Sequence, residues 1–119
     1  PNQIFKNYKN EFLKCKNKNM KYFDDPFEGV KKSNCIMTDV WVSMGEKNKN
    51  KVKYFKNFTV NKKIMTNASS NAIFMHCLPA KRGKEVTSDV LDGKNSVVLQ
   101  QAKNRMYIQQ AILIYVLKK

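Results

Sequence analysis

The sequence predicts an α/β fold in which helices flank a parallel sheet and a long helix ends the chain. Two apolar runs, residues 35–42 and 72–77, are rich in β-branched and bulky side chains, as is typical of buried parallel strands. Segments with apolar residues at helical spacing precede, separate and follow these runs. Because helices that alternate with apolar strands indicate a parallel sheet, we expect the 119 residues to form one α/β domain.

For the first third of the chain, the sequence predicts two helices separated by a short extended segment. Residues 2–18 carry apolar side chains at helical spacing, and residues 20–23 could form a short strand. An aspartate followed by a proline, at residues 24–26, marks a helix start, because the carboxylate can cap the helix and proline fits its first turn. We expect this second helix to run to residue 31.

The later elements follow the same pattern of apolar spacing. In chain order we predict a buried strand (35–42), a break (43–45), helices (47–58 and 61–68), a second buried strand (72–77) ended by Leu78 and Pro79, a short helix capped by Ser88, an extended stretch or helix lead-in (96–99) and a last helix (101–117). No apolar run approaches the ~20 residues of a membrane span, so residues 111–117 are expected to be a buried helix end.

The net charge of +14 does not by itself indicate a nucleic-acid partner. Only two of the 23 basic residues are arginines, whereas base readout and phosphate clamping favour arginine. The lysines are interspersed with asparagines over both halves of the chain, which is typical of solvated surfaces. We therefore expect no nucleic-acid and no membrane partner. The alternative, a basic nucleic-acid-binding domain, would bind DNA or RNA with strong salt dependence.

Three cysteines, Cys15, Cys35 and Cys77, are far apart and form no CxxC pair. This spacing favours neither a disulfide framework nor a zinc site. With no leader sequence in these residues, a reducing cytoplasm is the expected location, and no metal or cofactor is expected.

The most informative polar residues lie where the two predicted strands end. Asp39 stands among apolar residues, where a carboxylate needs either a backbone turn to cap or a ligand ammonium group to bind. A cysteine at the position of Cys77 is more often a small buried side chain than a reactive group, and the neighbouring His76 is expected to point to the opposite face of the strand. In parallel sheets, ligands bind beyond the carboxyl ends of strands, so both positions are candidate site residues.

Two further features could contribute to such a site. Ser43, Met44 and Gly45 offer a hydroxyl, a flexible apolar side chain and a hinge, as in a loop that closes over a ligand. Arg105 could bind an anion, although a surface salt bridge is the simpler alternative.

Taken together, the motifs resemble ornithine carbamoyltransferases. Residues 38–45 (Thr-Asp-Val-Trp-Val-Ser-Met-Gly) are similar to the loop that closes over substrate in these enzymes, and residues 74–79 (Phe-Met-His-Cys-Leu-Pro) to their cysteine-containing signature. Stretches at 58–61, 82–87 and 96–105 follow in the family's order. The resemblance runs from about residue 24 to the end and favours ornithine over the aspartate, putrescine and acetylornithine relatives, which differ in these motifs. It implies a partial Rossmann-like sheet, with residues 1–119 as the carboxy-terminal part of the ornithine-binding domain.

The resemblance also implies roles for particular residues. Asp39 and Ser43 would hold the α-amino end of ornithine, and the backbone of Met44 its carboxylate. Cys77, with Asp39, would lie near the δ-amine, which must lose a proton before it can attack. The Leu78 carbonyl would orient the carbamoyl group, and Arg105 would contact an oxygen of carbamoyl phosphate. In the family an acidic stretch precedes Asn-Arg, whereas this chain has Gln-Gln-Ala-Lys at 100–103, which bears on the orientation of Arg105.

The family's phosphate-binding Ser-Thr-Arg-Thr and His-Pro-x-Gln motifs occur nowhere in these residues. We therefore expect the carbamoyl-phosphate domain to lie outside this chain, the parent enzyme to be a homotrimer, and this piece alone to form no measurable citrulline, because transfer needs both substrates held together. The alternative from another functional class is a non-catalytic remnant that retains an amino-acid pocket.

Overall fold

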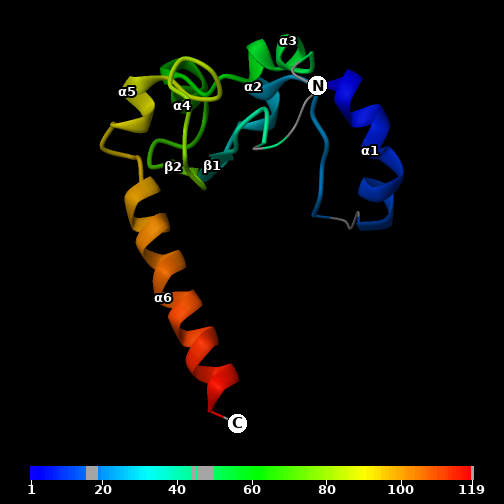
Figure 1. Ribbon diagram of the computed structural model, residues 1–119. Coiled ribbons are helices and arrows are strands. Elements are labelled where there is room, and N and C mark those ends of the chain that lie inside the picture. Colours follow the sequence, from blue (N-terminus) through cyan, green and yellow to red (C-terminus); the bar gives the residue numbers. More distant parts are fainter. Residues whose placement is uncertain (16–18, 44, 46–49, 119) are drawn as a thin grey trace.

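The computed structural model describes residues 1–15, 19–43, 45 and 50–118, whose arrangement is drawn in Figure 1. In chain order the elements are α1 (Asn2–Cys15), α2 (Pro26–Gly29), β1 (Cys35–Thr38), α3 (Val52–Phe55), the 3-10 helix η1 (Lys56–Phe58), α4 (Lys62–Asn67), β2 (Ile73–His76), α5 (Ser88–Leu91) and α6 (Val98–Leu117). The predicted α/β class, with a parallel sheet and a long C-terminal helix, is confirmed.

The sheet consists of β1 and β2, which run parallel with Cys35 opposite Ile73 and Thr38 opposite His76. Both strands are shorter than predicted, and they are buried on one face only. Ile36 and its partner Phe74 turn into the core, whereas Met37 is 59% exposed. The expectation of fully buried strands is therefore wrong, because alternate side chains point to opposite faces and the described helices pack mainly against one of them.

The hydrophobic core lies between this face of the sheet and the helices α4, α5 and the beginning of α6. Phe74 at its centre is completely buried, and Ile64 of α4 is 2% exposed. The other buried members of the cluster are Ile36, Val60, Val86, Val90, Leu91 and Val98. Single backbone bridges, Val60 with Val86 and Phe74 with Ser96, tie the connecting segments to this core.

Two of the short helices begin at a residue whose side chain caps the helix N-terminus. Asp25 accepts a hydrogen bond from the N–H of Phe27 (2.9 Å) and Pro26 occupies the first turn, as predicted for α2, although that helix ends at Gly29. Asn61 caps α4 by accepting from the N–H of Ile64 (3.1 Å). At α5 the prediction is wrong by one residue, since Thr87 holds the N-cap position and Ser88 is the first helical residue.

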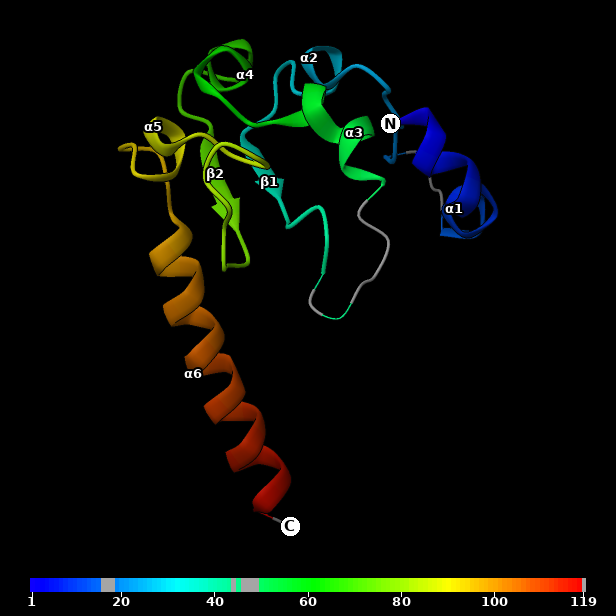
Figure 2. The same ribbon diagram turned by 45° about the horizontal axis from the view of Figure 1, so that its top comes forward.

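Helix α1 is held by the segment that follows it rather than by the core. The predicted strand at residues 20–23 is wrong, since this segment is extended but pairs with no strand in the described part of the chain. Instead the Tyr22 ring stacks on Phe5 with 3.8 Å between centroids, and Asp24 accepts hydrogen bonds from the N–H (2.6 Å) and side-chain amide (2.7 Å) of Asn2. Figure 2 shows α1 set apart from the sheet, at the opposite end of the molecule from α6.

Helix α6 contacts β2 with its first turns and then leaves the core, as Figures 1 and 2 both show. Its distal side chains are exposed, with Ile112 at 55%, Tyr115 at 80% and Leu117 at 79%. The expected burial of residues 111–117 is therefore wrong in this chain, because that part of the helix extends away from the other described elements (Figures 1 and 2). None of the helices in the described residues is both long and apolar enough to cross a membrane.

Candidate active site

The parallel register of the two strands brings Asp39 and Cys77 together. Thr38 and His76 are opposite each other at the strand ends, so the residue that follows each of them emerges at the same edge of the sheet. The Cys77 thiol donates a hydrogen bond of 2.9 Å to Oδ1 of Asp39. The N–H of Val40 donates to the same oxygen at 2.6 Å. The structure thus joins two predicted site residues that are 38 positions apart in the sequence.

The hydrogen bonds of this pair determine its protonation. The Cys77 thiol and then the Val40 N–H lower the pKa of Asp39 below its ordinary value of 3.8. The bond to Asp39, followed by partial burial and the carboxylate's negative charge, raises the pKa of Cys77 above its ordinary value of 9.0, although nearby Arg105 opposes this. At neutral pH the pair is therefore a carboxylate and a neutral thiol.

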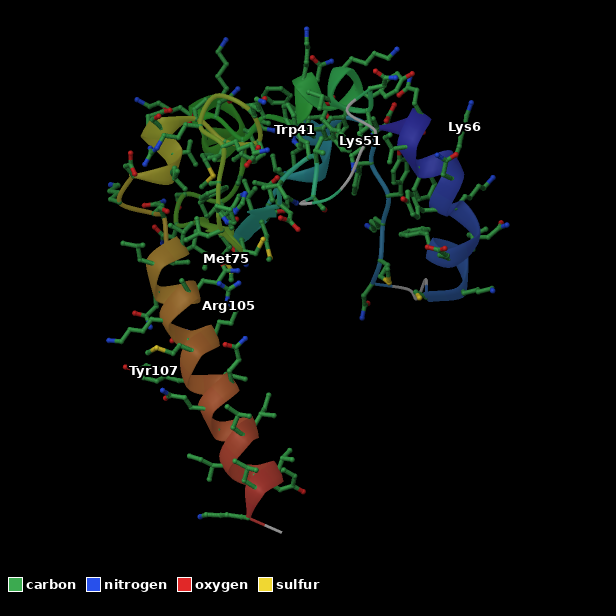
Figure 3. All side chains as sticks on the ribbon, in the orientation of Figure 1. Lys6, Trp41, Lys51, Met75, Arg105 and Tyr107 are labelled. Atoms are coloured by element: carbon green, nitrogen blue, oxygen red, sulfur yellow. The ribbon has the colours of Figure 1, made fainter. Side chains whose placement is uncertain are left out.

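Arg105, from the second turn of α6, lies against the same turn. Its Nη1 donates a hydrogen bond of 3.1 Å to the carbonyl oxygen of Cys77. In Figure 3, Arg105 and Met75 of β2 lie where α6 approaches the sheet, and Tyr107 lies on the other side of the helix. Arg105 thus bonds to the turn that follows β2, and the described residues show it in no salt bridge; its contact with carbamoyl phosphate stays a prediction.

The glutamines at 100 and 101 have contacts of their own. Gln101 accepts a hydrogen bond from the backbone N–H of His76 at 3.0 Å and so fastens the first turn of α6 to β2. Gln100 donates to the side chain of Asn104 at 2.8 Å. Arg105 therefore reaches the strand end although the acidic residues expected before it are replaced.

The turn at residues 76–79 has an unusual backbone. Leu78 has a φ of +57°, in the left-handed region, and a cis peptide bond joins it to Pro79. The N–H of Leu78 donates to Nδ1 of His76 at 2.8 Å, and the imidazole is completely buried on the opposite side of the strand from the Cys77 thiol. The His76 ring and the Cys77 thiol thus make separate hydrogen bonds, with Leu78 and with Asp39.

Glu85 is the residue that sequence reasoning missed. Its side chain is completely buried, with Oε1 3.5 Å from Nε2 of His76 and 2.5 Å from the backbone N–H of Lys81. The only sequence signal was an acidic residue between a lysine and Val86, which is as common on solvated surfaces as in a core. Nothing in local spacing indicates that the chain folds this carboxylate against a histidine nine positions earlier.

The predicted closing loop is described in part. Ser43 is exposed and follows Trp41, whose ring stacks with Phe55 of α3 at 5.8 Å between centroids. Gly45 has a φ of +83°, which glycine adopts without strain. Met44, predicted to contact the substrate carboxylate through its backbone, lies outside the described residues. The role of the loop therefore stays a prediction.

A cavity of about 620 Å³ opens beside Asp39 but does not coincide with the whole candidate site. Its walls come from α2, β1, α3 and the residues around them, including Trp41 and Phe58. Neither Cys77 nor Arg105 lines it, so the chemistry of the site lies at the open strand ends beside the cavity. Within the described ranges, no group of three His, Cys, Asp or Glu side chains is placed to hold a metal ion.

Proteins of one known family match nearly the whole chain. Residues 1–116 match the family described as aspartate/ornithine carbamoyltransferase, Asp/Orn binding domain. An ornithine carbamoyltransferase of Methanococcus vannielii is 47% identical over 98 residues, which cover 80% of this chain and 32% of that protein. Among solved structures, the ornithine carbamoyltransferase of Pyrococcus furiosus is 49% identical with a TM-score of 0.69, over 76% of this chain and 29% of that one. Ornithine transcarbamoylase of Giardia lamblia is 32% identical with a TM-score of 0.71, and the match covers 95% of this chain and 36% of that chain.

The extent of these matches defines what is shared. The chain spans about a third of the length of the curated relatives it matches. The matched part includes both strand ends and the beginning of α6, because the family match runs through residue 116. On this evidence the chain belongs to the aspartate/ornithine carbamoyltransferase family and matches its Asp/Orn-binding domain.

Proposed function

We propose that this chain forms the ornithine-binding half of an ornithine carbamoyltransferase active site. In that reaction the carbamoyl group of carbamoyl phosphate passes to the δ-amine of ornithine, giving citrulline and phosphate. One observation carries the proposal, namely the 2.9 Å hydrogen bond between Cys77 and Asp39 at adjoining strand ends. The relatives' names support ornithine as the amine that is carbamoylated.

The Asp39–Cys77 pair suits the binding and activation of an amine. The ornithine δ-amine, with a pKa near ~10 in its free form, is an ammonium ion at neutral pH and must lose a proton to attack. The ionised Asp39 attracts this ammonium group, and the neutral Cys77 thiol fixes the direction of the carboxylate. The ammonium group first loses one proton to solvent, and the neutral amine attacks. As its nitrogen bonds to the carbamoyl carbon, a second proton becomes acidic, so even a carboxylate with a low pKa can accept that proton. The bond from that carbon to the phosphate oxygen breaks, and phosphate leaves with the electron pair.

The raised pKa of Cys77 assigns the two residues different tasks. A thiolate is the nucleophilic and basic form of cysteine, and the bond to Asp39 disfavours it. We therefore place proton acceptance on Asp39 and orientation on Cys77.

The remaining candidate residues would bind the other parts of the two substrates. Ser43 and the backbone of Met44 would bind the amino-acid end of ornithine as the loop closes. The Leu78 carbonyl would orient the carbamoyl NH2. Arg105 would bind an oxygen of carbamoyl phosphate, since its guanidinium has further N–H donors besides the Nη1 that holds the Cys77 carbonyl.

We further propose that most of the carbamoyl-phosphate site, and the contacts of a homotrimer, come from residues outside this chain. The enzyme would serve arginine metabolism in the cytoplasm. The three free cysteines support a reducing compartment, and the exposed distal half of α6 supports a larger assembled protein.

The test is a chimera in which residues 1–119 replace the matching segment of a related full-length ornithine carbamoyltransferase. We expect the chimera to form citrulline from ornithine and carbamoyl phosphate, and the 119-residue chain alone to form none, because only the chimera holds both substrates in one cleft. A non-catalytic remnant would bind ornithine in calorimetry yet leave the chimera inactive. Robust turnover by the isolated chain would contradict the assignment of half a site.

A further inference from the structure

We propose that Glu85 is a positioning residue that acts through His76 to hold the turn at residues 76–79, and with it the Cys77 thiol, in place. Its meaning for catalysis rests on the proposed function above. The geometry itself involves neither substrate, so it can be tested without them.

The hydrogen bonds of His76 determine which of its nitrogens carries the proton. Nδ1 accepts the N–H of Leu78 at 2.8 Å, and a nitrogen that accepts such a bond carries no proton. In a neutral ring the proton must then be on Nε2. Nε2 is buried with Oε1 of Glu85 3.5 Å away, and it makes no hydrogen bond within the described residues. Glu85 is thus the group that favours this tautomer.

Glu85 also fastens the other side of the turn. The oxygen that faces His76, Oε1, accepts the backbone N–H of Lys81 at 2.5 Å. One buried carboxylate therefore contacts both His76, which precedes the Leu78–Pro79 bond, and Lys81, which follows it. Burying a carboxylate is unfavourable, and Oε2 of Glu85 makes no hydrogen bond within the described residues, so this costly placement indicates a specific role beyond filling space.

The turn needs a constraint of this kind because of Leu78. A φ of +57° is disfavoured for a residue with a branched side chain and persists only where the surroundings hold it. The bond from the Leu78 N–H to His76 is such a constraint. In the other tautomer, the Nδ1–H of His76 would face the N–H of Leu78, two donors without an acceptor, and the turn would be released.

The backbone of residues 76–79 determines two contacts of the candidate site. Cys77 lies between His76 and Leu78, so its thiol reaches Asp39 and its carbonyl reaches Arg105 only while this backbone is kept. Glu85 thus acts on Cys77 in three steps. It contacts His76, His76 bonds to Leu78, and this bond holds the backbone on which Cys77 lies. A buried pair with a purely structural role would contribute stability without controlling either the tautomer or the thiol.

The tautomer can be read directly because His76 is the only histidine in the chain. We expect two-bond ¹H–¹⁵N correlation spectra of the ¹⁵N-histidine-labelled 119-residue chain at neutral pH to show a protonated Nε2 and an unprotonated Nδ1. A protonated Nδ1, a doubly protonated ring or exchange between tautomers would overturn the proposal.

The link to the thiol can be tested in a background with Cys15→Ser and Cys35→Ser, which leaves only Cys77 to alkylate. Glu85→Gln keeps an acceptor oxygen, whereas Glu85→Met has a similar size and none. We expect Glu85→Gln to keep the slow alkylation and the wild-type tautomer. Glu85→Met should speed alkylation by about tenfold, because the thiolate fraction rises when the bond to Asp39 is lost.

Glu11→Met, on exposed α1, is the matched control and should leave the rate unchanged. Equal alkylation rates in Glu85→Gln and Glu85→Met would overturn the proposal. If Glu85→Met does not fold, the tautomers of wild type and Glu85→Gln decide the question, since a changed tautomer in Glu85→Gln also contradicts it. All these readouts are independent of ornithine and carbamoyl phosphate, so they separate this inference from the proposed function.

Discussion

The strand ends and the distal half of α6 differ in how their side chains are satisfied. At the strand ends, the Cys77 thiol that follows β2 bonds to Asp39, which follows β1, at 2.9 Å, and Arg105 of α6 bonds to the Cys77 carbonyl at 3.1 Å. In distal α6, apolar residues such as Tyr115 and Leu117 are about four-fifths exposed (80% and 79%). A helix that is apolar on all sides is typical of burial within a larger protein. The contacts of Asp39, Cys77 and Arg105 are therefore made within the chain, whereas the described residues leave the distal half of α6 uncovered.

The largest expected effect compares two isoleucines in these settings. Ile64→Ala removes a side chain that is 2% exposed and should destabilise the chain by about 2–5 kcal/mol, because it leaves a cavity in the core. Ile112→Ala, at 55% exposure on α6, should change stability by less than about 0.5 kcal/mol. Urea unfolding followed by circular dichroism measures both. Equal losses would mean that distal α6 is packed in solution.

The next comparison uses the two arginines of the chain. In the chimera, Arg105→Lys should lower citrulline formation by about 100-fold, because lysine cannot keep the Cys77 carbonyl and still offer a fork of donors to phosphate. Arg82→Lys is the matched control, since Arg82 only pairs with Asp92 on the surface. Steady-state rates of citrulline formation at saturating substrate concentrations measure both effects. If both variants lose citrulline formation to a similar extent, Arg105 has no specific role in the candidate site.

The pH dependence of the Asp39–Cys77 pair has a definite sign. The pKa of Asp39 is lowered, so its contribution to stability is present above its ordinary value of 3.8 and is lost as pH falls through the folded value. The pKa of Cys77 is raised, so its contribution is present below 9.0 and is lost as pH rises through the folded value. Asp39→Asn should therefore speed alkylation of Cys77 near pH 9. With Cys15→Ser and Cys35→Ser in place, mass spectrometry follows the reaction, and an unchanged rate would exclude the bond in solution.

The smallest effect on stability is expected in distal α6. Tyr115→Gln and Leu117→Gln together should leave the free energy of unfolding within about 0.5 kcal/mol of wild type, because neither side chain is buried. They should also reduce self-association of the isolated chain, since they remove exposed apolar surface. Sedimentation velocity measures the association. A large loss of stability would show that these residues pack against the core.

The sequence predicted the strand ends better than the strands themselves. Asp39 and Cys77 were placed at one sheet edge because parallel strands end together, and the register confirms this. Strand lengths, the open face at Met37 and the exposure of residues 111–117 were not predicted, because apolar composition indicates what a segment can bury without showing whether a partner is present. Glu85 could not be predicted, since its burial against His76 depends on the path of the loop between them.

The most direct test of the central claim is the rate of citrulline formation by the chimera with Asp39→Asn. The account predicts a fall of about 100-fold or more, because the variant removes the charge that attracts the δ-amine and the proposed acceptor of its proton. Asp89→Asn, an exposed aspartate on α5, is the matched control and should leave the rate unchanged. If Asp39→Asn forms citrulline as fast as the Asp89→Asn control, the Asp39–Cys77 pair is not the catalytic centre and the account is contradicted.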